Sequence, residues 1–207
     1  LLGLGLKEPS SSMKEILSKV DYTREIRNKE MAAKLQEGGI DITYDEILHR
    51  FPNSMIGRPH FAQIMQEKKI VQTRQKAFDL YLAKGTPYYI ERIGSNLDEA
   101  IIAIKESGGI PVVAHPMSLY LSWGKLPDML KDCYDKGVVG IEAFHPGARV
   151  TECLRLEELG RKIGFIITAG SDFHGEKIRA DRKLGHTCGG KKIDDKYYFE
   201  ELLRVLP

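Results

Sequence analysis

Three consecutive segments with one shared pattern constrain the fold of this chain more than any other feature. In each segment an amphipathic helix pattern ends at a glycine and is followed by a short apolar strand. The helices are expected at residues 96–107, 126–136 and 150–162, and the strands at residues 110–114, 138–143 and 165–169. Repeated helix–strand units predict parallel strands covered by helices, which is an α/β fold.

Polar side chains follow each of these three strands. His115 comes after the first strand, His145 after the second, and Asp172 and His174 after the third. Because the carboxyl ends of parallel strands meet at one edge, we expect these side chains to converge. A carboxylate and neutral imidazoles suit Zn, Mn or Fe, so the pattern predicts a divalent metal site. The competing interpretation is that Asp172 caps a helix and that the histidines are core, turn or surface residues.

Local backbone geometry gives further expectations for these residues. Asp172 and His174 are two residues apart, so in extended backbone both point to one side while Phe173 turns into the core. His115 precedes a proline, which favours extended backbone and directs the ring out of the strand end. His145 has the same setting, and it is open to interpretation as a ligand, a phosphate donor or a turn residue.

The first half of the chain has a different pattern. Residues 1–9 predict the end of a strand followed by a turn, residues 10–92 have helical periodicity, and residues 93–207 form the α/β part. Within the helical block we expect two helices between Met13 and Gln36 that separate near Asp21, and further helices at 43–49, 60–68 and 73–83. The pattern therefore predicts a helical insertion in an α/β domain.

A second candidate site lies in this helical block. Arg58 and His60 stand at the start of a predicted helix, in the sequence Gly-Arg-Pro-His. A guanidinium fork beside the positive end of a helix forms a pocket for an anion. The alternative is a proline-started helix with a solvated arginine.

Composition and cysteine usage exclude several classes of protein. Charged residues make up 29% of the chain but the net charge is only +2, which gives no electrostatic reason for tight, nonspecific binding to nucleic acid or membranes. Three scattered cysteines, Cys133, Cys153 and Cys188, do not form a disulfide framework and indicate a reducing compartment. From this cysteine usage we expect a cytoplasmic protein. No apolar run is long enough to span a membrane.

An ordered set of motifs resembles the phosphoesterase branch of the PHP (polymerase and histidinol phosphatase) superfamily. The motifs are Gly-Arg-Pro-His at 57–60, Ala-Phe-Asp-Leu-Tyr-Leu at 77–82 with Gly85 and Pro87, Val-Ala-His-Pro at 113–116, Gly-Ile-Glu at 140–142 and Gly-Ser-Asp-Phe-His-Gly at 170–175. This resemblance covers nearly the whole chain. It implies a partial, distorted (β/α)7 TIM-like barrel with the helical insertion over its mouth. It also implies two or three divalent metal ions, of Mn, Zn, Mg or Fe, that activate a water for attack on phosphorus.

The resemblance also implies roles for individual residues. His115, Asp172 and His174 match metal ligands of the family and would carry the catalytic site. Arg58 and His60 stand where contacts to the substrate phosphate are expected.

Two departures from the family's pattern affect this assignment. Relatives commonly carry a histidine two residues after the proline at 146, where this chain has Ala148, so either His145 substitutes for it in the substrate contact or that contact is lost. The family's opening His-x-His strand has no counterpart here, because the chain begins at Leu1 just where that portion would end. We therefore expect a C-terminal portion that binds metal weakly and turns over slowly.

The sequence thus predicts a metal-dependent phosphoesterase that hydrolyses phosphate monoesters of nucleotides or of short RNA ends. The expected partners are a small nucleotide or a short oligonucleotide, with neither membrane binding nor stable binding of duplex nucleic acid. Two alternatives stay open. One is a non-catalytic barrel remnant that binds a nucleotide or a partner, and the other is an amidohydrolase-type metal hydrolase that cleaves amides.

Overall fold

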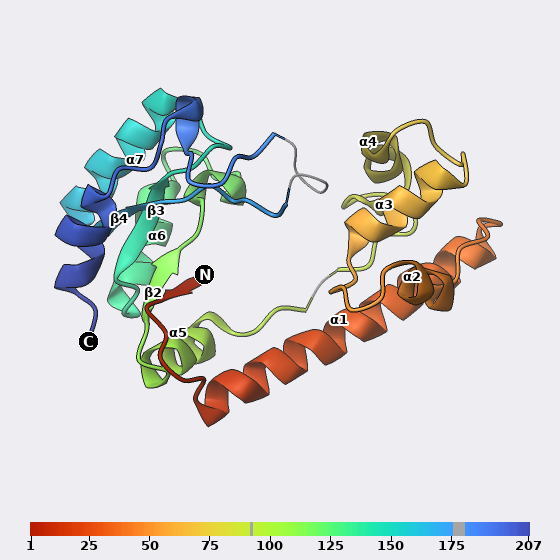
Figure 1. Cartoon of the computed structure of the whole chain (residues 1–207), viewed down its shortest axis with the longest axis horizontal. Coiled ribbons are helices and arrows are strands. Elements are labelled where there is room, and N and C mark those ends of the chain that lie inside the picture. The colour runs from red at the N-terminus through yellow and green to blue at the C-terminus, as the bar shows by residue number, and fades with distance from the viewer. Residues whose placement is uncertain (92, 176–180) are drawn as a thin grey trace. The chain divides into compact units, whose positions relative to one another are not determined.

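The computed structural model describes residues 1–91, 93–175 and 181–207. This part of the chain divides into two compact units (Figure 1). One unit, here called the sheet unit, comprises Leu1–Lys14 and Asn96–Pro207. The other, called the helical unit, comprises Glu15–Ser95. The position of the helical block over a barrel mouth stays a prediction.

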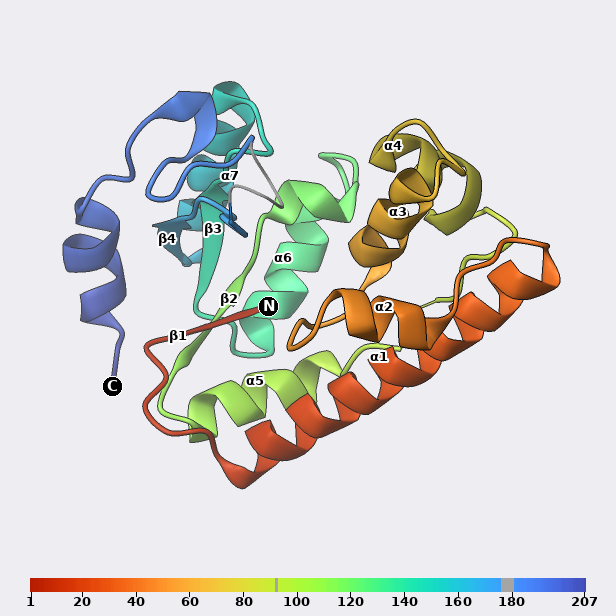
Figure 2. The same ribbon diagram turned by 45° about the vertical axis from the view of Figure 1, so that its right-hand side comes forward.

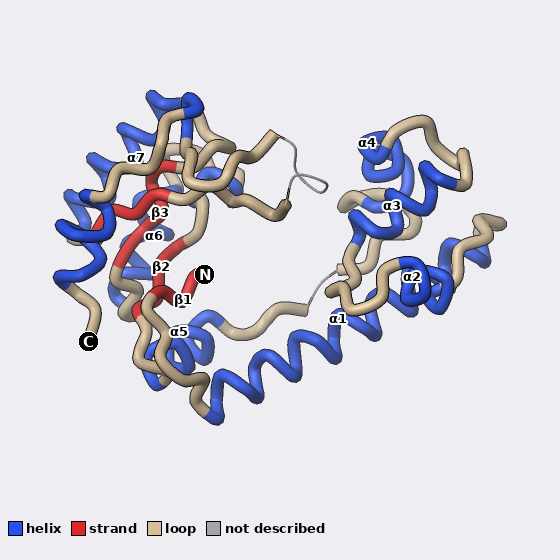
Figure 3. The backbone as a smooth tube through the Cα atoms, viewed as in Figure 1, coloured by secondary structure: helices blue, strands red, loops and turns tan. Residues whose placement is uncertain are grey.

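The sheet unit is built on four strands in the order β1-β2-β3-β4. These are β1 (Leu2–Leu4), β2 (Ile110–Val113), β3 (Gly140–Phe144) and β4 (Ile166–Ala169), drawn in red in Figure 3. Strands β2, β3 and β4 are parallel, as the helix–strand repeats predict, with Gly140 opposite both Val112 and Ile166. Strand β1 pairs antiparallel with β2, and among the described residues the sheet is open rather than closed into a barrel.

Three helices alternate with the parallel strands: α5 (Leu97–Glu106), α6 (Leu126–Asp135) and α7 (Val150–Ile163). Their buried side chains share one hydrophobic core with Ile141 of β3 and Ile167 of β4. Helix α7 packs directly against β3 and β4, as the two views of Figures 1 and 2 show. This close approach depends on Gly160, where a Cβ would lie 2.7 Å from Ile141 Cδ1 and 2.8 Å from Ile167 Cδ1.

Glycines end these helices as the sequence predicts. Gly108, Gly137 and Gly164 follow α5, α6 and α7 with φ angles of 75°, 96° and 110°. This left-handed conformation is one that glycine adopts without steric cost, and it turns the chain from each helix into the next strand. Because β2, β3 and β4 are parallel, their carboxyl ends lie at one edge of the sheet.

Helix α1 (Ser11–Glu37) corrects the prediction of two helices between Met13 and Gln36. It is one helix of 27 residues, capped at its start by Ser10, whose Oγ accepts a hydrogen bond from the Met13 backbone N–H at 3.1 Å. The predicted break at Asp21 is wrong because aspartate inside a helix costs only a fraction of 1 kcal/mol, roughly 0.7 at most. Neither glycine nor proline occurs between residues 13 and 37 to stop the helix.

The helical unit continues with α2 (Tyr44–Arg50), α3 (Arg58–Glu67), α4 (Arg74–Ala77) and the π-helical turn η1 (Phe78–Leu82). Thr43 caps α2 as predicted, because its Oγ1 accepts a hydrogen bond from the Glu46 N–H at 3.1 Å. The unit has its own core of buried residues: Met31, Ala32, Leu35, Ile42, Ile47, Ile56, Phe61, Ala62, Ile64, Met65, Val71, Ala77 and Leu82. It contains no strand between residues 15 and 91 or at 93–95.

Short turns complete the sheet unit. These are η2 (Pro116–Leu119), η3 (Cys188–Gly190), η4 (Tyr197–Glu201) and η5 (Leu202–Arg204). Turn η4 covers the edge of β4, where Glu201 Oε2 accepts a hydrogen bond from the Ile167 N–H at 3.2 Å. Within the described ranges, no helix combines the length and the apolar character needed to cross a membrane.

Candidate functional site

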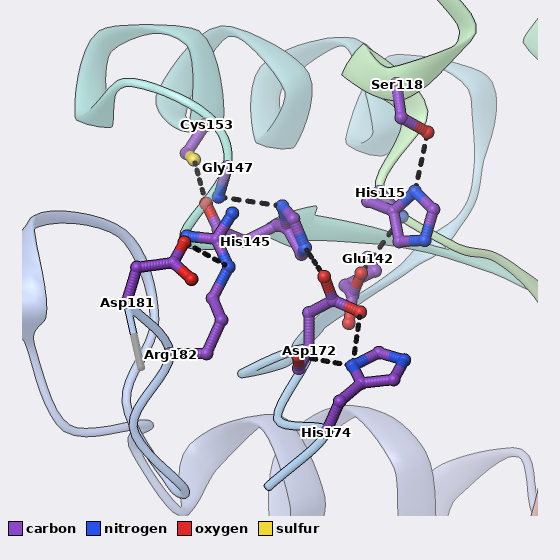
Figure 4. Close-up of polar contacts among 10 residues, drawn as sticks. All are labelled: His115, Ser118, Glu142, His145, Gly147, Cys153, Asp172, His174, Asp181 and Arg182. Atoms are coloured by element: carbon purple, nitrogen blue, oxygen red, sulfur yellow. Dashed lines mark hydrogen bonds and ion pairs between the residues drawn. The ribbon is translucent and has the colours of Figure 1, made fainter. Parts of the chain in front are cut away.

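A pocket of about 370 Å³ lies at the carboxyl ends of the parallel strands (Figure 4). His115 follows β2, His145 follows β3 and Asp172 follows β4, and all three line this pocket. The remaining lining residues are Met117, Ser118, Tyr120, Gly147 and Arg182. The structure therefore brings together residues from three strand ends that are far apart in the sequence.

Asp172 stands between two imidazoles. Its Oδ2 lies 3.5 Å from His145 Nε2, and its Oδ1 lies 3.5 Å from His174 Nδ1. The extended backbone expected here is wrong, because Asp172 has a left-handed φ of 49°, a conformation that aspartate tolerates better than most residues. Phe173 accordingly does not turn into the core and is 36% exposed.

The ring of His174 carries its proton on Nδ1. Its Nδ1 lies 2.8 Å from the Asp172 carbonyl oxygen, which can only accept, so Nδ1 donates and carries the proton. In the neutral ring Nε2 then has a lone pair available for an ion. Metal-binding histidines commonly donate their second ring N–H to a carbonyl or carboxylate in this manner.

His115 is held by both its backbone and its ring. Its N–H donates to Glu142 Oε2 at 2.9 Å, and its Nδ1 lies 2.6 Å from Ser118 Oγ. The prediction of extended backbone before Pro116 is wrong, since φ is 30° and ψ is 66°. Such strained backbone is found preferentially at functional sites, where the surrounding contacts hold it. The His115 and His145 ring centroids are 5.1 Å apart.

His145 has the opposite proton arrangement from His174. Its Nδ1 accepts a hydrogen bond from the Gly147 N–H at 2.9 Å, so the neutral ring carries its proton on Nε2. Burial lowers the pKa of His145, and the nearby His115 and Arg182 act in the same direction while Asp172 opposes them. The neutral His145 is therefore a hydrogen-bond donor toward the pocket.

Glu142 is a site residue that the sequence analysis did not assign. It lies on β3, is 7% exposed, and its backbone neighbours on the strand are buried. Burial, with a contribution from the charge of Asp172, raises the pKa of Glu142 to about 7, although the hydrogen bond from His115 opposes this shift. A carboxylate inside an otherwise apolar parallel strand was the signal that could have identified it.

Gly170 leaves the space that the Glu142 side chain occupies. A Cβ at this position would overlap Glu142 Oε1. The glycine of the Gly-Ser-Asp-Phe-His-Gly motif is therefore needed for close packing at the end of β4. The same Glu142 side chain reaches the backbone of His115, so this packing connects all three strand ends.

Arg182 lines the pocket, and the sequence analysis gave it no role. Its side chain is 12% exposed, and its Nε lies 3.6 Å from Asp181 Oδ2. A Cβ on Gly147 would lie 3.3 Å from Arg182 Nη2, which places the guanidinium beside the loop that follows β3. No sequence pattern distinguished this arginine from the other basic residues around it.

Arg58 and His60 belong to the helical unit. Arg58 Nη1 donates to the Leu82 carbonyl oxygen at 3.1 Å, and its guanidinium lies 5.3 Å from the centroid of the Tyr89 ring. His60 Nδ1 accepts a hydrogen bond from the Gly57 N–H at 3.1 Å, which caps α3. Burial lowers the pKa of His60, and the charge of Arg74 adds to this effect. Their contact with a substrate phosphate stays a prediction.

The donor chemistry of Asp172 and of His174, which does not line the pocket, fits a divalent ion. Asp172 supplies carboxylate oxygens, and His174 supplies an unprotonated Nε2 whose partner nitrogen is hydrogen-bonded. In the part of the chain that the structure describes, however, no group of three or more His, Cys, Asp or Glu side chains is arranged to hold a metal ion. The ligand set of His115, Asp172 and His174 therefore remains a proposal.

Relatives of this chain are enzymes that act on phosphate esters. A 3′,5′-nucleoside bisphosphate phosphatase from Chromobacterium violaceum is 27% identical over 188 residues, which cover 90% of this chain and 66% of that protein. The 5′-3′ exoribonuclease Rnm of Salmonella typhimurium is 26% identical over 174 residues, covering 84% of this chain and 59% of that protein. The chain thus spans about three fifths to two thirds of the length of these curated relatives. No protein-family model matches it.

Two solved structures share its fold. An amidohydrolase from Chromobacterium violaceum, solved with bound sulfate and no metal, has a TM-score of 0.79 at 25% identity over 93% of this chain and 66% of that one. A protein from Bifidobacterium adolescentis assigned as a metal-dependent phosphoesterase has a TM-score of 0.79 at 27% identity over 96% of this chain and 69% of that one. The matched relatives are homologous to this chain over 84–96% of its length, and they agree with the resemblance to PHP-type metal-dependent phosphoesterases that the sequence predicts.

Proposed function

We propose that this protein is a metal-dependent phosphoesterase that hydrolyses phosphate monoesters of nucleotides or of short RNA ends. One observation supports this function above the others. Asp172, His115, His145 and Arg182 line one pocket at the carboxyl ends of parallel strands, in a chain whose relatives are a nucleotide phosphatase and exoribonucleases. The pocket combines ligands for a cation with donors for an anion, which is what a phosphate ester and its metal require.

We assign His115, Asp172 and His174 as the metal ligands and the catalytic site. A divalent ion, when bound there, would lower the pKa of a water and neutralise charge on the phosphoryl oxygens. Glu142 would position His115 by accepting its backbone N–H. His145 would donate its Nε2–H to a phosphate oxygen, as its hydrogen bond from Gly147 favours.

Several finer features belong to the same proposal. The complete site would hold two or three ions of Mn, Zn, Mg or Fe in a distorted (β/α)7 barrel, with the helical unit as a cap that brings Arg58 and His60 to the substrate. The substrate would be a nucleotide or a short oligonucleotide. We also propose a cytoplasmic location, which suits three buried cysteines that are free thiols.

Hydrolysis of an amide is the second candidate, because a structural relative with a TM-score of 0.79 is an amidohydrolase. The two functions predict different substrates for the same pocket. Arginine and protonated imidazole nitrogen are donors that suit an anionic phosphate better than a neutral amide. We therefore favour the phosphoesterase.

The experiment is a comparison of substrate classes. The protein is incubated with Mn²⁺, Zn²⁺ or Mg²⁺ and with adenosine 5′-monophosphate, a 5′-phosphorylated RNA dinucleotide or an N-acyl amino acid. We expect slow release of phosphate that a chelator abolishes, and no release of the amino acid. Release of the amino acid would support the amidohydrolase, whereas tight nucleotide binding without hydrolysis under any metal would support a binding module.

A further inference from the structure

The helical unit contains a cavity that the proposed function does not use. It has a volume of about 330 Å³ and is bordered by α1, by α2 and by the loop that follows α2. We call it the Asn28 cavity, and its lining residues are Asp21, Arg24, Glu25, Asn28, Tyr44, Leu48, Asn53, Ser54, Met55 and Ile56. Asn28 and Ile56 are buried, whereas Leu48 and Met55 are exposed and form a rim that is open to solvent.

The side-chain amide of Asn28 is bonded at one end only. Its Nδ2 donates to the Ile56 carbonyl oxygen at 3.0 Å, and because a carbonyl can only accept, this bond identifies the nitrogen end of the amide. The other end, Oδ1, is buried in a residue that is 1% exposed, and it has no hydrogen-bond donor among the residues that the structure describes. A buried amide oxygen without a donor is costly, so this group calls for a donor from another molecule.

The charges around the cavity favour a neutral ligand. Asp21 and Glu25 are carboxylates, and Arg24 is a guanidinium. Beside them, Lys29 Nζ pairs with Glu25 Oε1 at 2.7 Å. Because two charges of each sign are present, the lining attracts neither anions nor cations strongly. We therefore expect the missing hydrogen bond to come from a neutral donor.

The apolar part of the lining favours a flat ring. Tyr44 is aromatic, and Leu48, Met55 and Ile56 are flexible or branched aliphatic side chains that adapt to a ring face. A heteroaromatic base packs its face on such side chains and presents its hydrogen-bonding groups at its edge. An amino group at that edge is a neutral N–H donor of the kind that Asn28 Oδ1 lacks.

We propose that the Asn28 cavity binds a neutral heteroaromatic base that carries an amino group, as adenine and cytosine do. The amino group would donate to Asn28 Oδ1 while the ring packs against Tyr44 and Met55. This inference does not rest on the proposed function, because the interaction needs neither a phosphate nor a metal. All the lining residues belong to the helical unit, and none of them lines the pocket at the strand ends.

Nucleosides without phosphate test the site. The ¹⁵N-labelled protein, without metal, is titrated with adenosine and with cytidine while the Asn28 side-chain amide and the Gly147 backbone amide resonances are followed. Each nucleoside is compared with its analogue that lacks the amino group, purine riboside or pyrimidin-2-one riboside. We expect saturable shifts at Asn28 and an affinity about 10-fold lower for the matching analogue. The tighter of the two nucleosides identifies the preferred ring as a purine or a pyrimidine.

A pair of variants locates the interaction. Asn28→Ala removes the amide oxygen, and Glu30→Gln is the control, because Glu30 is an exposed residue of α1 that does not line the cavity. We expect the affinity for the preferred nucleoside to fall about 10-fold in Asn28→Ala and to stay at the wild-type value in Glu30→Gln. If Asn28→Ala does not fold, the comparison of nucleoside with analogue in the wild-type protein decides.

Three results would overturn the site. These are equal affinities for both nucleosides and their analogues, shifts at Gly147 without shifts at Asn28, and no saturable shift with any nucleoside, which would mean that the cavity holds water only. If a nucleoside binds as proposed but no phosphate ester is hydrolysed with any metal, the site stands and the proposed function fails. Hydrolysis of phosphate esters without binding at Asn28 would leave the proposed function standing and overturn this inference.

Discussion

At the scale of single residues, the proton positions on two histidines give them opposite roles. His174 donates from Nδ1 and keeps a lone pair on Nε2, whereas His145 accepts at Nδ1 and keeps a proton on Nε2. These proton positions suit the roles proposed above, with His174 as a ligand of a cation and His145 as a donor to an anion. Residue type alone does not distinguish these roles, because the neighbouring backbone sets them.

This difference predicts that the two histidines respond differently to substitution. His174→Ala should lower the affinity for Mn²⁺ at least about 10-fold, because a ligand is lost. His145→Ala should leave Mn²⁺ affinity within about 3-fold of wild type, since Nε2 is not a ligand in its neutral form. Calorimetric titration with Mn²⁺ measures both. Equal losses in the two variants would contradict the assignment of proton positions.

Gly170→Ala tests the packing of Glu142. The added Cβ overlaps Glu142 Oε1, so we expect the free energy of unfolding to fall by about 1–3 kcal/mol. In a protein that already carries Glu142→Ala, the same change should cost less than about 1 kcal/mol, because the overlapping atoms are gone. Gly94→Ala is the control, since no atom lies within 4 Å of its Cβ. Denaturant unfolding of the four variants measures the coupling, and equal costs in both backgrounds would exclude it.

At the scale of secondary-structure elements, the distance between α7 and the sheet is set by a glycine. Gly160→Ala would raise helix propensity by about 1 kcal/mol, yet its Cβ would contact Ile141 and Ile167 at 2.7 and 2.8 Å. We expect the contacts to dominate and the free energy of unfolding to fall by about 1–3 kcal/mol. Chemical denaturation measures this loss, with Gly124→Ala as a control, because its Cβ would come no closer than 3.9 Å to Ser122 Oγ. An increase in stability would show that α7 can move away from β3 and β4 without cost.

The elements predicted from the sequence are those with strong local signals. Helices α5 to α7 and the parallel strands were predicted from the glycines that follow the helices and from the spacing of the apolar residues. Both signals are local, because helix ends and buried strands are determined largely by nearby residues. The single helix α1 was missed because aspartate is a weak breaker. The left-handed backbone at His115 and Asp172 was missed because contacts from other strands hold it, and no local pattern encodes them.

The candidate site was predicted in part for the same reason. His115, His145 and Asp172 were expected to converge because each follows a strand end, and all three line the pocket. The roles of His115, Asp172 and His174 as metal ligands stay a prediction. Arg182 follows no predicted element, so its place in the pocket depends on tertiary structure alone. Glu142 could have been found, since a carboxylate inside a buried strand requires a partner.

At the scale of the whole molecule, the residues that the structure describes form two hydrophobic cores, one in each compact unit. Phe61 is fully buried in the core of the helical unit. Phe61→Ala should destabilise that unit by about 3–5 kcal/mol while the sheet unit keeps its stability. Leu80→Ala is the control, because Leu80 is 53% exposed.

Hydrogen exchange measures whether the two units lose stability independently. We expect faster exchange in α3 of Phe61→Ala and unchanged exchange in β3 and α7. An equal loss of protection in both units would mean that they unfold together as one cooperative structure.

The central claim is that Asp172 belongs to a metal-dependent phosphoesterase site, and one paired measurement tests it most directly. Mn²⁺ affinity and Mn²⁺-dependent phosphate release from adenosine 5′-monophosphate are compared in the wild-type protein, in Asp172→Asn and in the control Asp135→Asn, an exposed residue at the end of α6 that pairs with Lys131. We predict a loss of Mn²⁺ affinity of about 10- to 100-fold and an even larger loss of phosphate release in Asp172→Asn, because a neutral amide replaces a charged ligand. Asp135→Asn should match wild type. Unchanged Mn²⁺ affinity and phosphate release in Asp172→Asn would show that the site lies elsewhere.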